Sequence, residues 1–361
     1  MTHTVTLIPG DGIGPEISDA MVRVVEACGV AIAWESVTAG EAAFEKSGTP
    51  LPPEVIASIK KNRVAIKGPT ATPIGTGFRS INVALRKELD LYANVRPAVS
   101  IPGTGARYED VDVLIVRENT EDLYAGIEFG EGSDAAAELI DWVARKGSGK
   151  IRPDSGISIK PISISGSERI VRYAFEYALA NNRRRVCAVH KANIMKDSDG
   201  LFLEVARRVA AEYTDRIEFE DRIVDATCMQ MVLDPADFDV LVLPNLYGDI
   251  VSDLAAGLIG GLGMAPGANI GSEYAIFEAV HGTAPLIAGQ GIANPTALIL
   301  SAAQMLRHLG EQQAAARIER AVQAVYRAGA TLTGDIVKTR TGSTKGAAST
   351  QEFTTAVIAA L

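Results

Sequence analysis

Short apolar runs alternate along the chain with longer segments in which apolar residues recur every three or four positions. The short runs predict buried β-strands, and the longer amphipathic segments predict α-helices. The predicted strands are Val5–Ile8, Val64–Ile66, Val113–Val116, Val186–Val189 and Val240–Leu243. The predicted helices are Glu16–Cys28, Pro53–Lys61, Ser167–Ala180, Leu201–Glu212 and Ala297–Leu309. This alternation indicates an α/β fold with much parallel pairing, and no internal repeat is seen.

One stretch interrupts the alternation. Between Gly126 and Ile164 the chain is rich in glycine and carries short alternating pieces such as Gly156–Ser165. This pattern predicts a surface excursion with its own hairpin, of the kind that clasps a partner subunit. A long surface loop without such a role is the alternative.

Length and composition are those of a globular protein. The 361 residues predict one large domain or two of ordinary size. Hydrophobic residues make up 47% and charged residues 22%, which is enough for a sizeable core and argues against disorder. The balance of 35 basic and 44 acidic residues gives a net charge of -9 and argues against nonspecific nucleic-acid binding. A small anionic substrate stays compatible, because a local cluster of arginines overcomes a negative average.

The cysteines and the chain start bear on the compartment. Cys28, Cys187 and Cys228 have no metal-binding spacing and form no disulfide framework, so each is expected to be a small buried hydrophobe. The strand Val5–Ile8 follows the first residue so soon that no signal peptide is expected. No apolar run reaches membrane-spanning length. We therefore expect a cytoplasmic protein that binds no membrane.

Two aspartates four residues apart follow the apolar run Val240–Leu243. A buried strand, a turn and a helix start read this way, and on a helix Asp249 and Asp253 share one face. Two carboxylates that close repel each other unless a cation lies between them, and hard oxygen ligands suit Mg²⁺ or Mn²⁺. The alternative is structural: Asp249 favours the helix N-terminus and Asp253 is solvated.

Glycines mark two loops. Gly10–Glu16 follows the first strand, but its glycines alternate and do not have the GxGxxG spacing, so we reject a Rossmann dinucleotide site there. A tight turn into a helix, with Pro15 at its first position, is the simpler interpretation. The second loop, His281–Pro295, is glycine-rich and carries imidazole, hydroxyl and amide groups. Taken alone, it favours a structural role over a cofactor role.

Several polar residues lie at the ends of apolar segments. Arg86, Arg96 and Arg117 could each be solvated, but together they could bind a substrate with several carboxylates. Tyr124 and Lys191 ordinarily titrate near pH 10, so acid–base work at neutral pH requires a lowered pKa. Packing and solvation are their ordinary roles. Asp225 would supply a third carboxylate if the fold brought it near Asp249.

Together these segments resemble the β-decarboxylating dehydrogenases, the family of isocitrate, isopropylmalate and homoisocitrate dehydrogenases. The resemblance covers essentially the whole chain. The matching motifs are Gly10–Glu16, Lys67-Gly68-Pro69, Ser80–Arg86, Asn94-Val95-Arg96-Pro97, Arg117–Tyr124, His190–Met195, Asn245–Asp253 and His281–Asn294.

The resemblance implies a fold and an assembly. It implies two α/β domains with a mixed, largely parallel sheet that is not a Rossmann fold. Residues 1–91 and 260–361 would form the large domain, residues 92–121 and 165–259 the small domain, and residues 122–164 a clasp-like arm. It also implies a homodimer in which Lys191 and Asp225 reach the active site of the partner subunit.

The resemblance also implies roles for individual residues. Tyr124 and Lys191 match the acid–base pair, and Asp225, Asp249 and Asp253 match the ligands of Mg²⁺ or Mn²⁺. The substrate residues would be Ser80, Asn82, Arg86, Arg96 and Arg117. The nicotinamide cofactor would bind at Thr72, Glu278, His281, Gly282, Thr283, Ala284, Leu286, Ile287 and Asn294.

Substrate and cofactor follow from what the matching positions carry. Ser80 and Asn82 can hydrogen-bond a third carboxylate, so we expect oxidative decarboxylation of isocitrate to 2-oxoglutarate, with homoisocitrate or 3-isopropylmalate as alternatives. NAD is expected as cofactor, because a 2′-phosphate needs positive charge that Leu286 does not offer. Lys338 and Arg340 keep NADP as the alternative. A non-catalytic regulatory subunit is the rival class, although such subunits typically lose the residues that are present here.

Overall fold

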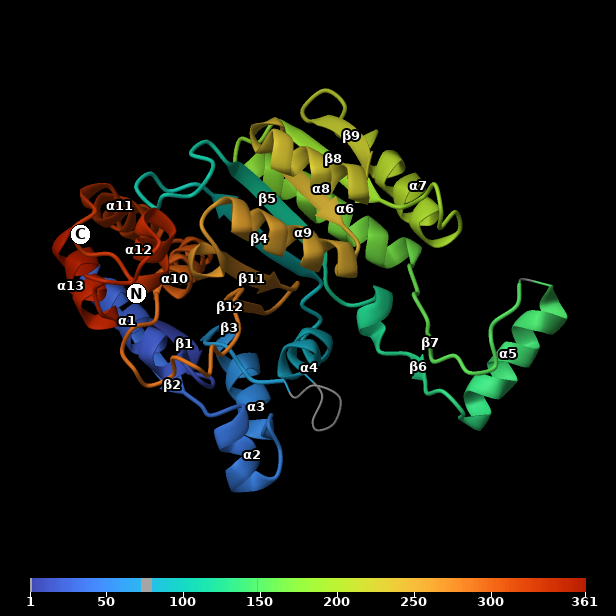
Figure 1. The fold of residues 1–361 in the computed structure, drawn as a ribbon, viewed down its shortest axis with the longest axis horizontal. Helices are drawn as coiled ribbons and strands as arrows, with labels where there is room; N and C mark the ends of the chain where they lie inside the picture. Colours follow the sequence, from blue (N-terminus) through green and yellow to red (C-terminus); the bar gives the residue numbers. More distant parts are fainter. Residues whose placement is uncertain (1, 73–79, 148) are drawn as a thin grey trace.

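The computed structural model describes residues 2–72, 80–147 and 149–361, which form a ten-stranded sheet with helices on both faces and a two-stranded sheet beside it (Figure 1). The order of the large sheet is β2-β1-β3-β12-β11-β4-β5-β10-β8-β9, and that of the small one is β6-β7. The strands are β1 His3–Ile8, β2 Ile32–Ser36, β3 Val64–Lys67, β4 Ala93–Val99, β5 Asp112–Glu118, β6 Glu128–Phe129, β7 Ile157–Ser158, β8 Arg185–His190, β9 Glu218–Ile223, β10 Val240–Leu243, β11 Pro266–Ile270 and β12 Ala275–Ala279.

Thirteen α-helices and three short 3₁₀ helices are assigned in the described residues. The α-helices are α1 Gly14–Ala27, α2 Glu41–Ser47, α3 Pro53–Asn62, α4 Ile81–Glu88, α5 Asp134–Lys146, α6 Ile164–Ala180, α7 Ser198–Ala210, α8 Val224–Leu233, α9 Asn245–Leu258, α10 Thr296–His308, α11 Gln312–Ala328, α12 Gly334–Thr341 and α13 Thr350–Ala359. The 3₁₀ helices are η1 Asp122–Ala125, η2 Pro235–Asp237 and η3 Leu262–Met264. No helix within the described ranges is long and apolar enough to cross a membrane.

The predicted α/β class with a mixed, largely parallel sheet is confirmed. Each strand and helix predicted from the apolar pattern overlaps an observed element of the same type, and β10 has the predicted bounds. Strands on the two flanks of the sheet pair in parallel, whereas β11 is antiparallel to both β12 and β4, and β4 is antiparallel to β5. The antiparallel centre distinguishes the sheet from that of a doubly wound Rossmann fold.

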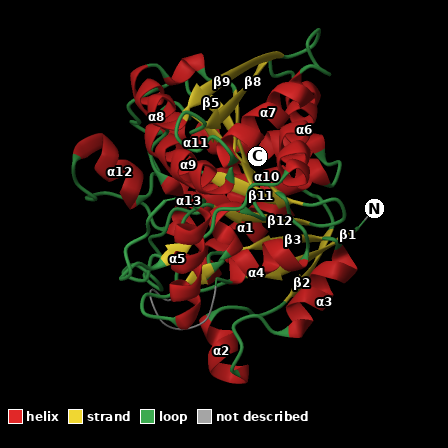
Figure 2. Cartoon of the chain, turned by 90° about the vertical axis from the view of Figure 1, so that its right-hand side faces the viewer, coloured by secondary structure: helices red, strands yellow, loops and turns green. Residues whose placement is uncertain are grey.

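The two flanks come from different parts of the chain. The flank β2-β1-β3-β12-β11 uses both ends of the sequence, and the flank β4-β5-β10-β8-β9 uses its middle. These groups have the strand composition expected of the two predicted domains, whose boundaries stay a prediction. Helices α1, α10, α11 and α13 pack together beside the first flank, and both chain ends lie on that side of the molecule (Figure 1). On the second flank, α6 and α7 lie on one side of the strands and α8 and α9 on the other (Figure 2).

The interrupted stretch forms an arm. Strands β6 and β7 pair antiparallel, and α5 lies between them in the sequence and extends away from the body of the molecule (Figure 1). Ser133 begins α5 by accepting a hydrogen bond from Ala136 N, and Gly147 ends it in the left-handed conformation. The hairpin predicted for this excursion is present, and the helix within it was not predicted.

The cysteines fit the sequence analysis in part. All three are free thiols. Cys28 and Cys187 are buried as expected, whereas Cys228 is only half-buried on α8.

Candidate active site

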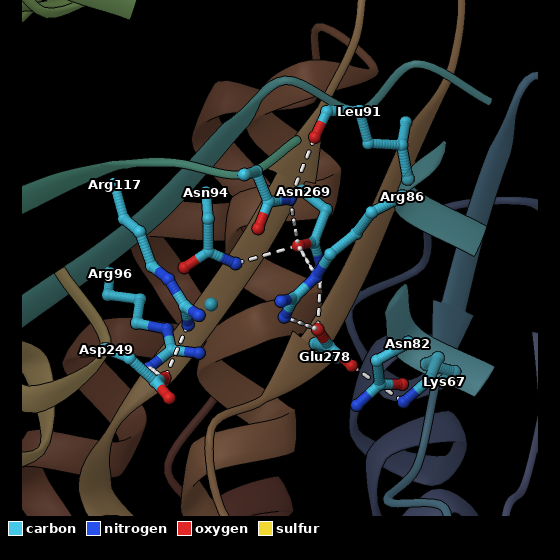
Figure 3. Close-up of polar contacts among 12 residues, drawn as sticks. Lys67, Asn82, Arg86, Leu91, Asn94, Arg96, Arg117, Asp249, Asn269 and Glu278 are labelled. Atoms are coloured by element: carbon cyan, nitrogen blue, oxygen red, sulfur yellow. Dashed lines mark hydrogen bonds and ion pairs between the residues drawn. The ribbon is translucent and has the colours of Figure 1, made fainter. Parts of the chain in front are cut away.

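Three arginines converge on one side of the sheet (Figure 3). Arg86 comes from α4, Arg96 from β4 and Arg117 from the neighbouring strand β5, and they are only 6%, 8% and 1% exposed. Arg86 and Arg96 line a cavity of about 110 Å³. Burial lowers the pKa of Arg117 to about 9, and repulsion by Arg96 and Arg86 adds to the effect. The three side chains lie together and concentrate positive charge that suits an anionic ligand, and their role in substrate binding stays a prediction.

A carboxamide hub orients Arg86. The side-chain oxygen of Asn269 accepts hydrogen bonds from Arg86 Nε at 3.1 Å, from Asn94 at 2.7 Å and from Asn119 at 3.0 Å. The Asn269 amide in turn donates to Glu278 at 2.7 Å (Figure 3). All these groups are buried, so the hub fixes the guanidinium before any ligand arrives. Asn269 and Asn119 were not singled out from the sequence, because isolated asparagines carry no distinctive spacing.

Lys67 and Glu278 form a buried ion pair at the cavity wall. Lys67 Nζ lies 2.7 Å from Glu278 Oε2, and Arg86 lies 3.5 Å from Glu278 Oε1. Burial alone would raise the pKa of Glu278, but Lys67 and Arg86 together lower it to about 2. Glu278, predicted as a cofactor residue, therefore also holds Lys67 and Arg86 in place. Lys67 was recognised only as part of a motif, and its position at the end of an apolar strand was the signal.

Asp249 is the carboxylate that faces the arginines. It accepts hydrogen bonds from Arg117 at 2.5 Å, Arg96 at 3.2 Å and the Tyr124 hydroxyl at 2.5 Å. Burial would raise the pKa of Asp249, but Arg117 and Arg96 outweigh it and the net shift is downward. Asp253 lies 3.7 Å from Arg96, one helical turn further along α9. The predicted helix with both carboxylates on one face is confirmed.

The donor chemistry at α9 fits a divalent cation. Burial raises the pKa of Asp253, and the negative charge of Asp249 adds to the rise. A carboxylate whose ionisation is opposed by a neighbouring carboxylate is stabilised by a shared cation with hard oxygen preference. Asp249 and Asp253 are thus suited to hold Mg²⁺ or Mn²⁺. Within the part of the chain that the structure describes, no three acidic, histidine or cysteine side chains are grouped to hold a metal.

Asp225 and Lys191 form a separate pair. Lys191 Nζ donates a short hydrogen bond to Asp225, which lies on α8 and has 68% of its side chain exposed. Lys191 is the first cause of the lowered pKa of Asp225. No contact joins this pair to Tyr124 or Asp249 within the described chain. A single copy therefore does not assemble the acid–base pair or the three-aspartate set that the resemblance implied.

Tyr124 is held between the arginines and α9. Its ring lies 4.8 Å from the Arg117 guanidinium carbon, and its hydroxyl donates to Asp249. Burial raises the pKa of Tyr124, and the hydrogen bond to Asp249 raises it further. The sequence analysis required a lowered pKa for acid–base work, and the opposite shift is found. Tyr124 is therefore a protonated hydroxyl at neutral pH.

Asp122 places Tyr124 and α9 relative to each other. It is fully buried and has a φ of 66°, in the left-handed region that is costly for a residue with a side chain. Its carboxylate accepts from Leu246 N at 2.9 Å, in the first turn of α9, and from Leu123 N at 2.8 Å. This residue was not predicted, although an aspartate two positions before Tyr124 was visible.

Ser80 and Asn82 lie at the start of α4. Asn82 lines the cavity, and its side-chain oxygen accepts a hydrogen bond from Thr70 at 3.4 Å. Ser80 is the N-cap residue, half-buried and with no capping hydrogen bond from its side chain. Asn82 is thus positioned with Arg86 and Arg96, whereas Ser80 flanks the cavity lining without belonging to it.

The loop after β12 closes the same cavity. His281 and Gly282 line it beside Arg86 and Arg96. His281 Nδ1 lies 2.9 Å from Gly282 O, while its buried Nε2 has no hydrogen-bond partner. Burial lowers the pKa of His281, which leaves a neutral imidazole. An orphaned ring nitrogen next to a glycine with open space above it fits a bound ligand such as a nicotinamide cofactor.

The other predicted cofactor residues have varied surroundings. Ala284 has a φ of 42°, and Ile287 N donates to Ala284 O. Leu286 is 90% exposed, and Thr72 is exposed at the edge of the described segment. Asn294 is buried and donates to Asp335 at 2.8 Å. Asn294 is therefore tied into the protein, and Thr283 acts through its backbone, as described below.

Comparisons with known proteins agree with this geometry. The model of the family described as isocitrate/isopropylmalate dehydrogenase matches residues 4–357. A mitochondrial regulatory subunit of the NAD isocitrate dehydrogenase of Dictyostelium discoideum is 53% identical over 333 residues, which is 92% of this chain and 86% of that protein. The mitochondrial alpha subunit of the NAD isocitrate dehydrogenase of Homo sapiens is 51% identical over 337 residues, with the same shares covered.

A solved structure is similar over the whole fold. The crystal structure of isocitrate dehydrogenase from Methylococcus capsulatus has a TM-score of 0.90 and 53% sequence identity, and the match covers 99% of each chain. The cytoplasmic location expected from the sequence is wrong by comparison with the curated relatives, because both the Dictyostelium and the human protein are named as mitochondrial. Their names also describe subunits of an enzyme, one of them regulatory.

Proposed function

Because the chain belongs to the isocitrate/isopropylmalate dehydrogenase family, we propose that it catalyses the oxidative decarboxylation of isocitrate to 2-oxoglutarate with NAD and Mg²⁺ or Mn²⁺. The observation that carries this proposal is the cavity in which Arg86, Arg96 and Asn82 meet His281 and Gly282. Buried guanidinium groups there suit a carboxylate-rich ligand, and the adjoining loop has an unpartnered imidazole nitrogen.

The residues of the chain divide the work. Arg86, Arg96 and Arg117 bind the substrate carboxylates bidentately. Asp249 and Asp253, with Asp225 of the partner subunit, would hold the cation, which would supply Lewis-acid polarisation of the substrate hydroxyl when bound. The loop at His281 and Gly282 would hold the nicotinamide cofactor, which would supply the hydride acceptor. Lys191 of the partner subunit takes the hydroxyl proton, and the protonated Tyr124 hydroxyl donates a proton to carbon after CO₂ has left.

Substrate choice rests on Asn82 and Ser80. An amide and a hydroxyl at the start of α4 can hydrogen-bond the third carboxylate of isocitrate. An apolar isopropyl group would leave the Asn82 amide without a ligand partner. Initial rates with isocitrate, homoisocitrate and 3-isopropylmalate test this, and faster oxidation of either alternative would refute the proposal.

Cofactor choice rests on the exposed Leu286. It adds no positive charge for a 2′-phosphate, and relatives named above are NAD enzymes. Replacing Leu286 with Asp should then improve use of NAD by offering an acceptor to the ribose hydroxyls. A higher kcat/KM with NADP than with NAD in the unaltered protein would contradict the choice.

The surface supports a homodimer with shared sites. Helices α8 and α9 expose Met229, Val232, Leu233 and Ile250, which form an apolar face beside the exposed Asp225. The arm around α5 also extends clear of the body. A second copy placed on these surfaces would cover the apolar side chains and bring its Lys191 and Asp225 to the first copy's cavity. The two predicted domains and the predicted clasp-like arm are part of this proposal.

Mixing two inactive variants tests the sharing. Tyr124→Phe and Lys191→Met homodimers should each be nearly inactive. After unfolding and refolding of an equal mixture, half of the dimers are hybrids with one intact site, so about a quarter of the wild-type activity should return. No recovery would show that one chain supplies both groups.

A regulatory subunit is the second candidate, favoured by the name of the Dictyostelium relative. Turnover by the purified single chain with Mg²⁺ would exclude it. Absence of turnover, with activity restored by a second type of subunit, would support it instead.

A further inference from the structure

The segment Gly10–Glu16, rejected as a dinucleotide fingerprint, lies against the two loops that border the cavity. Ile13 N donates to Thr283 O at 3.0 Å, and Asp11 N donates to Pro69 O at 2.7 Å. A Cβ atom on Gly12 would lie 2.1 Å from Thr283 O, and one on Gly10 would lie 2.1 Å from Pro69 O. These two glycines therefore serve close backbone packing against the loops, which explains their alternate spacing.

Glu16 extends this contact to the far end of the second loop. Its Oε1 accepts a hydrogen bond from Ala293 N at 2.9 Å, and its Oε2 accepts one from Gly291 N at 3.2 Å. The buried hydroxyl of Thr350, at the start of α13, makes a short contact with Oε1 and lies 2.6 Å from Ala293 O. Because each carboxylate oxygen of Glu16 accepts a hydrogen bond from one backbone amide, the side chain fixes the position of this turn.

Asp11 does the same for the first loop. It is 6% exposed, and its carboxylate accepts from Ala71 N at 2.8 Å and from Glu41 N at 2.9 Å. Ala71 immediately precedes Thr72, and Pro69 and Thr70 line the cavity. The segment between β1 and α1 thus carries two carboxylates, one for each loop.

We propose that Glu16 is a positioning residue for dinucleotide binding, which it supports by fixing the loop His281–Asn294 through the amides of Gly291 and Ala293. Glu16 is not among the residues that line the cavity. The inference rests on the proposed function, because that function assigns the loop to the nicotinamide cofactor. Three open glycines, Gly282, Gly289 and Gly291, lie in the loop, and the last two have a positive φ, so the shape of the loop depends on such external anchors.

The test compares Glu16→Gln with Glu26→Gln, an exposed glutamate on the same helix that serves as the matched control. In Glu16→Gln one end of the side chain becomes an NH₂ group that faces a backbone N–H. The Kd for NAD, measured by titration without substrate, should rise about tenfold, and the KM for NAD should rise in parallel. The KM for isocitrate and kcat at saturating NAD should stay within about twofold.

Amide hydrogen exchange supplies the second readout. Gly291 and Ala293 should exchange about tenfold faster in Glu16→Gln, with α1 and the central strands unchanged. Thr350→Val, which removes the hydroxyl and keeps both carboxylate acceptors, should raise the Kd for NAD by a smaller factor of about three.

Two results would overturn the proposal. One is an unchanged Kd for NAD in Glu16→Gln; the other is an equal rise in both KM values with faster exchange throughout the protein. If the wild-type protein binds NAD but does not oxidise isocitrate, the proposed function fails, while the Kd and exchange measurements still decide the role of Glu16.

Discussion

The two faces of strands β4 and β11 border two cavities that differ in size and chemistry. On one face Arg96, Asn94 and Gly267 line a cavity of about 110 Å³. On the other face the alternate residues Val95, Pro97, Pro266 and Ala268 line a cavity of about 680 Å³. Successive side chains of a strand point to opposite faces. The polar residues of β4 and β11 therefore face one cavity, and their apolar neighbours in the sequence face the other.

The difference lies in how charge is used. In the larger cavity Arg307 is paired with Glu319, and Arg183 with Asp112 and Asp239, so each cation already has a carboxylate of its own. Arg86 and Arg96, which line the smaller cavity, and the neighbouring Arg117 share Asp249 and Glu278, and repulsion among them contributes to the lowered pKa values of Arg86 and Arg117. Unbalanced buried charge, rather than volume, makes the smaller cavity the better candidate for an anion site.

The largest effect is expected from replacing Asp249, the carboxylate that faces the arginines. Asp249→Asn should lower kcat/KM by at least about a thousandfold, because it removes a cation ligand and the partner of Arg117 and Arg96. Steady-state rates at saturating Mg²⁺ measure this. Glu319→Gln is the matched control. It breaks the ion pair with Arg307 at the larger cavity and should change kcat/KM by less than about twofold. Similar losses in both variants would contradict the contrast between the faces.

The next largest effect is expected from a change of packing at the larger cavity. Phe277 is 2% exposed and borders the larger cavity. Phe277→Ala should reduce the free energy of unfolding by about 3 kcal/mol, near the low end for such truncations because the ring already faces open space. Urea denaturation measures the loss, and Phe277→Leu should show a smaller one. At temperatures where the variant is folded, kcat/KM should stay within about threefold of wild type.

The buried pair Lys67–Glu278 predicts a pH dependence of stability. The folded-state pKa of Glu278, about 2, lies below its ordinary value of 4.5, so its stabilisation is present above pH 4.5 and is lost as the pH falls toward 2. Between pH 7 and pH 3 the contribution should fall by about 2 kcal/mol. The difference in unfolding free energy between wild type and Glu278→Gln should shrink by that amount over this range. A difference that is constant with pH would show that the carboxylate is not preferentially ionised in the folded protein.

The smallest effect is expected at Gln304. Its buried side-chain amide nitrogen borders the larger cavity and has no hydrogen-bond partner. Gln304→Leu should therefore stabilise the protein by about 0.5 kcal/mol and leave kcat/KM unchanged. Gln312→Leu is the control, because Gln312 donates to Arg307 O and its loss should give no gain. Thermal unfolding of the two variants separates these outcomes.

The sequence was sufficient to predict helices and strands in segments where a single hydrophobic period dominated. The apolar run Val240–Leu243 could only be a buried strand, and the spacing of Asp249 and Asp253 was sufficient to place both on one helix face. The strands β4 and β11 were missed because polar residues, proline and glycine interrupt their apolar pattern. Those interruptions are the site itself, since Asn94, Arg96 and Asn269 replace core residues on one face.

Residue roles were less predictable than residue positions. The arginines and Asp249 were found because their types match carboxylate and cation chemistry. The direction of the Tyr124 pKa shift was not, because it depends on burial and on the hydrogen bond to Asp249. Glu16 was noted as the end of the glycine segment Gly10–Glu16 and the start of a predicted helix. Its actual partners, Gly291 and Ala293, lie more than 270 positions away along the chain and could not be inferred from local spacing.

The pairing of β3 with β12 has a consequence for biosynthesis. Lys67 and Glu278, at the ends of these strands, are separated by 211 positions. When the ribosome has released β1, β2 and β3, the next strand of their flank has not been made, and β3 presents an open edge. The flank β4-β5-β10-β8-β9 uses only residues 93–243 and can form first. The edge of β3 must then stay unpaired, and be protected from aggregation, until the last third of the polypeptide has been synthesised and β12 pairs with it.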